Sequence, residues 1–206
     1  MHENKHALKL PDFGLVEPSE LTPAAQRILD AASRLFYWYG IHAVGVARIE
    51  QEASVTKKTI FDRFGSKERL VAEYLRRRDQ TWRRRLKYAV QPYQQASDAR
   101  GVILATFDAL EHWVTDENPR GCAFVNALAE ITSPEHEGHA VVMQQKAWIA
   151  DYFFALAEQS EMSDAKALSE QLLILYEGAT VVNALGRYRR PVLTARATAA
   201  QLIPSA

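Results

Sequence analysis

Apolar residues recur at helical spacing from residue 22 almost to the end of this chain, and this periodicity limits the fold more than any other feature. The first helix carries an apolar stripe on one face: Ile28, Ala32, Leu35, Phe36 and Tyr39. Thr22 and Pro23 are typical of a helix start, because the Thr hydroxyl can accept a backbone N–H and Pro at the first helical position loses no hydrogen bond. No segment alternates like a half-buried strand, so the sequence predicts an all-α protein.

The remaining helices are separated by turns that contain Gly, Pro, Asn or Ser. Helices are expected at 46–53, 57–63, from about 66 toward Pro92, and near 98–115, 121–132, 135–159, 163–187 and 193–203. Helices of about two turns are marginal alone, so the two short ones must pack against the first. The predicted organisation is a flexible N-terminal arm at 1–21, a three-helix helix-turn-helix domain at 22–68, and a connector with a C-terminal helical domain at 69–206.

Composition excludes several classes of protein. Apolar residues make up 48% of the 206 residues, which is enough for a real core and excludes bulk disorder. The single cysteine excludes an intramolecular disulfide. No apolar run approaches the ~18 residues that a membrane span needs. The first residues lack the apolar region of a secretory signal. We therefore expect a cytoplasmic protein. No Gly-rich phosphate loop, nucleophile elbow or metal-ligand cluster indicates a catalytic residue, a cofactor or a metal.

The charge is uneven, although the chain is neutral overall. Residues 1–90 hold 17 cations against 11 acids, and residues 91–206 hold 8 against 14. A basic first half suggests a part that meets a polyanion. Seven of the cations lie in the run 76–87, where they are distributed over all faces of a helix. We therefore interpret this run as a solvated connector.

Two short helices joined by a tight turn and braced by a third form the arrangement in which the second short helix enters the DNA major groove. In the segment 56–64, Ile60 and Phe64 share one face, four residues apart. Basic and hydroxyl side chains occupy the other faces and can meet phosphates and base edges. The alternative is that these cations only form a solvated helix face.

The strings RILDAASRLFYWYG and VARIEQEASVTKKTIFDRFGSKERLVAEYL, within residues 22–75, resemble the DNA-binding domain of the TetR family of transcriptional repressors without a gap in spacing. The chain departs from the family pattern at Gly45, Glu50, Ser54 and Phe61, where a Thr or Ser, an Ala, a Gly and a Tyr are usual. The resemblance implies a set of groove and backbone contacts: Thr56, Lys57, Lys58, Thr59, Phe61, Arg63 and Lys67.

The same resemblance implies that the C-terminal helices form a homodimer on a palindromic operator and hold a small-molecule inducer. A helix that is apolar nearly all round, 172–185, fits the pairing of two subunits. Candidate inducer contacts are Phe107, Trp113, Cys122, Phe124, Asn126, Met143, Trp148, Tyr152 and Tyr176. These aromatic residues could instead be plain core, and Cys122 could be a thiolate sensor or a small buried hydrophobe. A ligand-independent DNA-binding dimer and a helical enzyme are the alternative functions.

Overall fold

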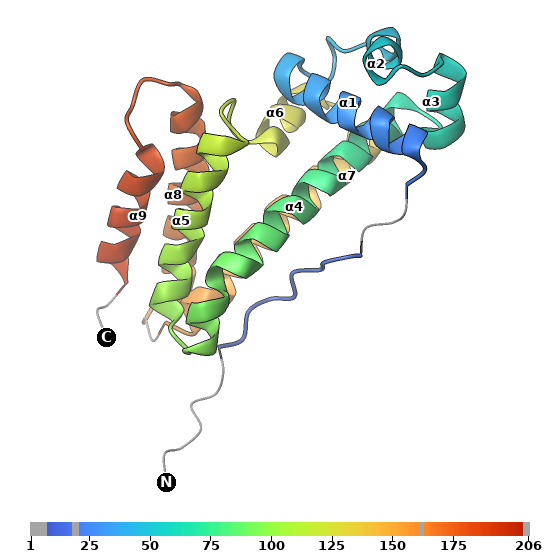
Figure 1. Ribbon diagram of the computed structural model, residues 1–206. Coiled ribbons are helices and arrows are strands. Elements are labelled where there is room, and N and C mark those ends of the chain that lie inside the picture. The colour runs from blue at the N-terminus through green and yellow to red at the C-terminus, as the bar shows by residue number, and fades with distance from the viewer. Residues whose placement is uncertain (1–7, 18–20, 161–162, 204–206) are drawn as a thin grey trace. The chain divides into compact units, whose positions relative to one another are not determined.

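The computed structural model describes residues 8–17, 21–160 and 163–203, and every regular element in that part of the chain is an α-helix (Figure 1). The all-α prediction is confirmed, and the helices start and end close to the predicted positions. Their bounds are α1 Pro23–Tyr39, α2 Val46–Ala53, α3 Lys57–Phe64, α4 Lys67–Gln95, α5 Ala99–Asp116, α6 Ala123–Glu130, α7 Glu137–Glu158, α8 Ala165–Ala184 and α9 Pro191–Leu202.

The chain divides into two compact units, which are described separately. Unit 1 comprises residues up to 15, 82–121 and 146 onward, and unit 2 comprises 16–81 and 122–145. The division falls inside α4 and inside α7, so each of these helices contributes to both units. The segment 22–68, predicted from the sequence as a DNA-binding domain, therefore shares its compact unit with α6 and the first part of α7.

Unit 2 is built around α1, whose ends follow the sequence signals. Thr22 Oγ1 accepts a hydrogen bond from the backbone N–H of Ala25 at 3.3 Å, and the helix ends at Gly40, whose φ of 89° suits a residue without Cβ. One face of α1 packs on both short helices, as their length requires. Fully buried side chains from four helices form the centre of this core: Ile28, Ile49, Ile60, Leu70 and Leu75.

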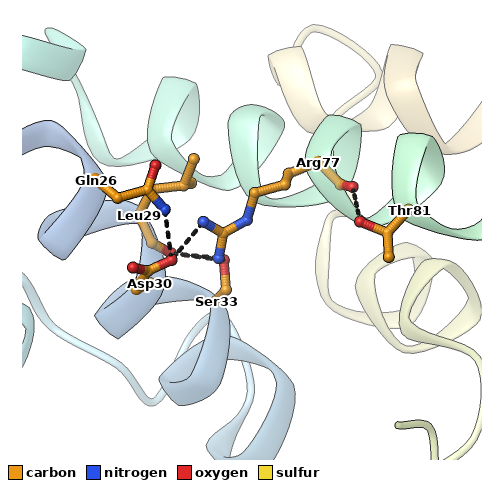
Figure 2. A network of polar contacts seen from close by, with 6 residues as sticks. All are labelled: Gln26, Leu29, Asp30, Ser33, Arg77 and Thr81. Atoms are coloured by element: carbon orange, nitrogen blue, oxygen red, sulfur yellow. Dashed lines mark hydrogen bonds and ion pairs between the residues drawn. The ribbon is translucent and has the colours of Figure 1, made fainter. Parts of the chain in front are cut away.

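A polar network joins α1 to α4 within unit 2 (Figure 2). The Arg77 guanidinium lies between α4 and α1, where it pairs with Asp30 at 2.6 Å and donates to Ser33 Oγ at 2.9 Å and to the Leu29 carbonyl at 3.3 Å. Gln26 donates to the same Asp30 oxygen at 2.9 Å. Because three acceptors on α1 surround one planar guanidinium, this contact fixes the position of α1 along α4.

Unit 1 contains α5, α8 and α9, which pack side by side (Figure 1). Its core is rich in aromatic rings that contact one another in tilted and edge-to-face pairs. The fully buried Tyr152 hydroxyl lies 2.8 Å from Thr106 Oγ1, so its polar atom is satisfied. Burial raises the pKa of Tyr152 far above its ordinary value, and the phenol stays protonated in the folded protein.

Residues 8–17 differ from the predicted mobile arm. They form no helix, and Leu8 and Phe13 are buried in the core of unit 1. The sequence argument relied on Pro11, Gly14 and missing periodicity, which exclude a helix but do not exclude an extended segment whose side chains dock one by one. The rest of the predicted arm, 1–7 and 18–20, lies outside the described residues, and residue 21 is exposed.

Candidate nucleic-acid interface

Helices α2 and α3 and the three residues between them form a helix-turn-helix. The turn begins at Ser54, at the position where the TetR pattern usually has Gly. The φ of Ser54 is 51°, which lies in the left-handed region that favours glycine. The turn continues through Val55 to Thr56, which caps α3: its Oγ1 accepts a hydrogen bond from Thr59 N at 3.2 Å. Gly45 begins α2 without a side-chain cap, as its missing hydroxyl predicts.

The two faces of α3 separate as the spacing predicts. Ile60 and Phe64 are buried in unit 2. The predicted DNA contacts lie on the rest of the helix, where Thr59 is half-buried and the others are exposed: Thr56, Lys57, Lys58, Phe61 and Arg63. An apolar ring such as that of Phe61, which is 38% exposed on a cationic helix, can contact a thymine methyl or a sugar.

The exposed cations of α3 have short-range partners within the helix. Lys58 Nζ lies 2.6 Å from Asp62 Oδ2 one turn later, and both side chains are more than half exposed, so the pair contributes little to stability. Lys57 Nζ lies 5.9 Å from the centre of the Phe61 ring. These contacts can exchange for phosphate contacts at low cost, because water screens both of them.

Glu50 is a functional residue that sequence reasoning missed. Its Oε1 accepts a hydrogen bond from the backbone N–H of Lys57 at 3.0 Å, which links α2 to the first residue of α3. Glu50 therefore acts as a second cap, beside Thr56, on the helix predicted to enter the groove. In the sequence, Glu50 lies seven residues before Lys57, the first residue of α3. The two residues are in contact only because of the way α2 and α3 are arranged in the folded unit.

Lys67 differs from the cations of α3. It begins α4, is half-buried, and its Nζ donates to the Ile41 carbonyl at 2.6 Å. Burial lowers the pKa of Lys67 from its ordinary value, while the nearby negative charge of Glu130 acts in the opposite direction. Glu130 also accepts a hydrogen bond from His42 N at 2.7 Å, so the same α1–α2 turn is held from both sides. Lys67 thus has a structural contact in addition to its predicted phosphate contact.

The basic run 76–87 is more strongly bound within the protein than a solvated connector would be. Besides Arg77, Arg78 lies 4.3 Å from the Tyr37 ring centre, and Arg85 pairs with Glu117 at 3.0 Å. Arg83 is buried and donates to the Phe13 carbonyl at 3.2 Å. The interpretation as a solvated face is wrong for these four arginines, since elements distant in the sequence supply their partners.

The predicted inducer contacts are divided between the two units. Unit 2 contains four of them: Cys122, Phe124, Asn126 and Met143. Unit 1 contains the other five, in one aromatic core: Phe107, Trp113, Trp148, Tyr152 and Tyr176. In that core Tyr176 contacts the Phe107 ring at 6.5 Å, and Trp148 stacks on Tyr152 at 5.4 Å. Met143 is 49% exposed, whereas Phe124 is buried in unit 2.

Known proteins share both the sequence pattern and the fold. Residues 28–74 match the family model described as bacterial regulatory proteins, tetR family. SCO4454, a TetR-family transcriptional regulator from Streptomyces coelicolor, is 30% identical and superposes with a TM-score of 0.75 over 89% of this chain and 97% of its own. The chain belongs to the TetR family. It is a helix-turn-helix transcriptional regulator rather than an enzyme.

Two further comparisons are informative. The HTH-type transcriptional regulator YjdC of Escherichia coli is 26% identical over 130 residues, which are 63% of this chain and 65% of YjdC. The transcriptional regulator FadR of Bacillus subtilis, in a structure with stearoyl-CoA, covers 86% of this TetR-family chain at a TM-score of 0.65. Its 12% identity shows a common fold alone.

Among the residues that the structure describes, no group of three or more His, Cys, Asp and Glu side chains is placed to hold a metal ion. None of the helices in the described ranges is both long and apolar enough to cross a membrane.

Proposed function

We propose that this TetR-family protein is a homodimeric repressor that binds a palindromic operator and is released by a small-molecule inducer. The observation that carries the proposal is the exposed face of α3, where basic, hydroxyl and aromatic side chains surround a helix anchored by Ile60 and Phe64. A helix held by its apolar face in this way can enter a major groove without losing its packing.

Each α3 residue has a role that fits its chemistry. Lys57 and Arg63 carry charges that meet phosphates or the acceptor edge of guanine. Thr56 and Thr59 supply hydroxyl groups, and Lys58 can leave Asp62 for a phosphate. Phe61 meets a thymine methyl or sugar, and Lys67 adds a phosphate contact at the start of α4. The missing hydroxyls at Gly45 and Phe61 remove two backbone contacts, which the cations of α3 replace.

The homodimer is supported by apolar side chains exposed on α8 and just after it. Ile174 is 70% exposed, Leu185 66% and Tyr188 59%. Ile174 and Tyr188 line a groove of about 380 Å³ between α8 and α9, whose walls also include Leu175 and Val182. Exposed apolar surface of this kind indicates a protein partner, and a second copy would place two α3 helices about one DNA turn apart.

A substitution on this surface tests the dimer. Ile174→Asp places a charge at an exposed position, so the subunit should fold while the dimer dissociates at least tenfold more readily by analytical ultracentrifugation. Tyr88→Asp is the matched control, because Tyr88 is also exposed in unit 1, to 81%, but lies on α4. If both variants dimerise like the parent, the α8–α9 surface is not the interface.

The inducer is proposed to bind the released conformation better than the DNA-bound one, which is the only way that a ligand can shift this equilibrium. The aromatic core of unit 1 supports an apolar or aromatic ligand, and the remaining candidates in unit 2 belong to the compact unit that contains α3. FadR, a protein of this fold, was crystallised with an acyl-CoA.

Operator selection tests the DNA-binding proposal. Purified protein is mixed with fragments of its source genome at fixed physiological salt, because phosphate contacts make affinity depend strongly on salt. The bound fragments are sequenced beside those of Lys57→Ala/Arg63→Ala and of the control Lys87→Ala/Lys166→Ala, which loses two exposed cations elsewhere. We expect the parent and the control to enrich one inverted repeat, and the α3 variant to enrich none.

The outcomes are separable. Enrichment by the α3 variant equal to that of the parent would exclude the proposed groove contacts. Once the operator is known, compounds are scored by loss of DNA binding, and a protein that no compound releases would be a ligand-independent dimer.

A further inference from the structure

The N-terminal strap, residues 8–15, is held in unit 1 as an extended peptide is held by a binding groove. Gln159 pairs with both backbone polar groups of Lys9, accepting from its N–H at 2.7 Å and donating to its carbonyl at 2.6 Å. Gln94 donates to the Leu8 carbonyl at 3.3 Å. A side chain of α4 and one from the residue just after α7 thus bind the strap through its main chain, as peptide-binding sites do.

Aromatic side chains surround Phe13 of the strap. Its ring contacts Trp148 at 5.6 Å and Tyr152 at 6.2 Å between ring centres, and it is only 7% exposed. The carbonyls on the two sides of this ring are both bound. Trp148 Nε1 donates to the Asp12 carbonyl at 2.9 Å, and Arg83 Nη1 donates to the Phe13 carbonyl at 3.2 Å.

The Phe13 ring rests on a platform of three side chains: Trp148, Tyr152 and Arg83. These three side chains also contact one another. Trp148 stacks on Tyr152 with ring centres 5.4 Å apart, and the Arg83 guanidinium lies 4.1 Å from the centre of the Trp148 ring. The Tyr152 hydroxyl lies 2.8 Å from Thr106. These contacts within the platform favour the same shape when its occupant leaves, which is the requirement for a reusable binding site.

We propose that this platform is a ligand-binding site that the strap occupies in cis through Phe13. Its chemistry selects a small molecule with an aromatic ring flanked by two carbonyl acceptors. The ring replaces that of Phe13 on Trp148 and Tyr152. One carbonyl accepts from Trp148 Nε1 and the other from Arg83.

This inference rests on the proposed inducer response and gives it a mechanism. The strap competes with the ligand at an effective concentration set by its tether, so the site responds only to ligand levels that overcome this competition. Residues 16–22 connect the strap directly to α1 in the sequence. A ligand that displaces Phe13 therefore loosens the segment that leads to the first helix of the helix-turn-helix unit, which the bond from Val16 N to Gln80 Oε1 at 3.0 Å still holds. A docked strap is the unliganded state.

Tryptic cleavage after Lys9 measures whether the strap is docked. Both backbone groups of Lys9 are bonded to Gln159, and a protease needs a free extended segment. The probe is N-acetylphenylalaninamide, which offers the ring and the two carbonyls of the Asp12–Phe13 unit. N-acetylalaninamide has the same carbonyls without the ring and is the control. Cleavage of the full chain is followed by mass spectrometry, with trypsin activity checked on a small substrate.

We expect N-acetylphenylalaninamide, at up to tens of millimolar as the tether requires, to accelerate Lys9 cleavage at least fivefold and saturably. N-acetylalaninamide should not. Phe13→Ala should be cleaved at least tenfold faster than the parent without any probe. Val16→Ala, which truncates an exposed side chain just after the strap, should be cleaved like the parent.

Two results would overturn the proposal. If neither N-acetylphenylalaninamide nor N-acetylalaninamide changes the cleavage rate of the parent, the platform accepts only the strap. Cleavage of Phe13→Ala at the rate of Val16→Ala would show that the ring does not hold the strap. Because neither measurement uses DNA, a ring-dependent response with a failed operator selection would keep the binding site and remove its role in induction.

Discussion

Two cation-rich segments of this protein have opposite surroundings. On α3, Lys57, Lys58 and Arg63 are exposed, and Lys58 pairs with the carboxylate of Asp62, one turn away on the same helix. On α4, Arg77 is surrounded by three acceptors of α1, and Arg83 is buried beside Phe13. The run on α4 contains more charge, yet four of its arginines have partners from elements distant in the sequence, whereas the three cations of α3 are exposed.

The difference teaches that the partners of a cation matter more than the number of cations. A charge with several fixed acceptors from another element has a structural role, and moving it to a phosphate would break those bonds. A charge whose only partner is an exposed neighbour on its own helix gives up little when it moves.

The largest effect is expected from the exposed cations. Lys57→Ala/Arg63→Ala should weaken operator affinity about 100-fold, since each removed contact contributes roughly 1–2 kcal/mol. The urea midpoint of unfolding should stay within experimental error of the parent, because neither side chain is buried. Titration of labelled operator and equilibrium unfolding provide the two measurements. A shift of the unfolding midpoint would mean that Lys57 and Arg63 have a structural role, like the bonded arginines of α4.

The second largest effect concerns the arginine between α4 and α1. Arg77→Ala should lower the free energy of unfolding by about 2 kcal/mol, because the partly buried Ser33 hydroxyl and Leu29 carbonyl lose the guanidinium donor and Asp30 keeps only Gln26. Arg76→Ala, whose partner Glu73 is on the same helix and half exposed, should cost less than about 0.5 kcal/mol. Urea unfolding compares them. Equal losses would remove the distinction between the two kinds of cation.

Lys67 is the intermediate case and sharpens the comparison. Lys67→Ala should reduce operator affinity about tenfold and lower the slope of log affinity against log salt by roughly 1, as the loss of one phosphate contact does. The measurement is operator titration at several salt concentrations. An unchanged slope with a loss of stability would assign Lys67 to its contact with the Ile41 carbonyl instead.

The smallest effect is expected in the turn that positions α3. Ser54→Gly should raise the free energy of unfolding by about 0.5–1 kcal/mol, because a φ of 51° is strained for serine and allowed for glycine. Equilibrium unfolding measures the change, and operator affinity should not fall. Ser97 also has a positive φ, of 56°, so Ser97→Gly is a matched control outside the helix-turn-helix. A stabilisation by Ser97→Gly alone would mean that the α2–α3 turn is unstrained.

Much of the fold was predictable because its signals are local. A cap such as Thr22 and a C-terminal Gly40 act within one turn of helix, so their residue types indicate where α1 begins and ends. The buried face of α3 was predictable for the same reason, since Ile60 and Phe64 are one turn apart. The resemblance then indicated which residues on the other faces of α3 are expected to contact DNA.

The rest depended on residues far apart in the sequence. The strap is an example, because Pro11 and Gly14 correctly excluded a helix but contain no information about Trp148, which binds the Asp12 carbonyl 136 residues away in sequence. Glu50 is another, because its bond to Lys57 N exists only at the observed angle between α2 and α3.

The sequence by itself determined the helices, the family and the set of cations that a DNA-binding surface could use, since these follow from periodicity, capping and a gap-free motif. Only the tertiary structure decided which cations are turned inward, and that Leu8 and Phe13 are part of a core. The physical reason is that burial and pairing are properties of neighbours in space. A side chain of one type can therefore be a solvated charge on α3 or a buried donor on α4.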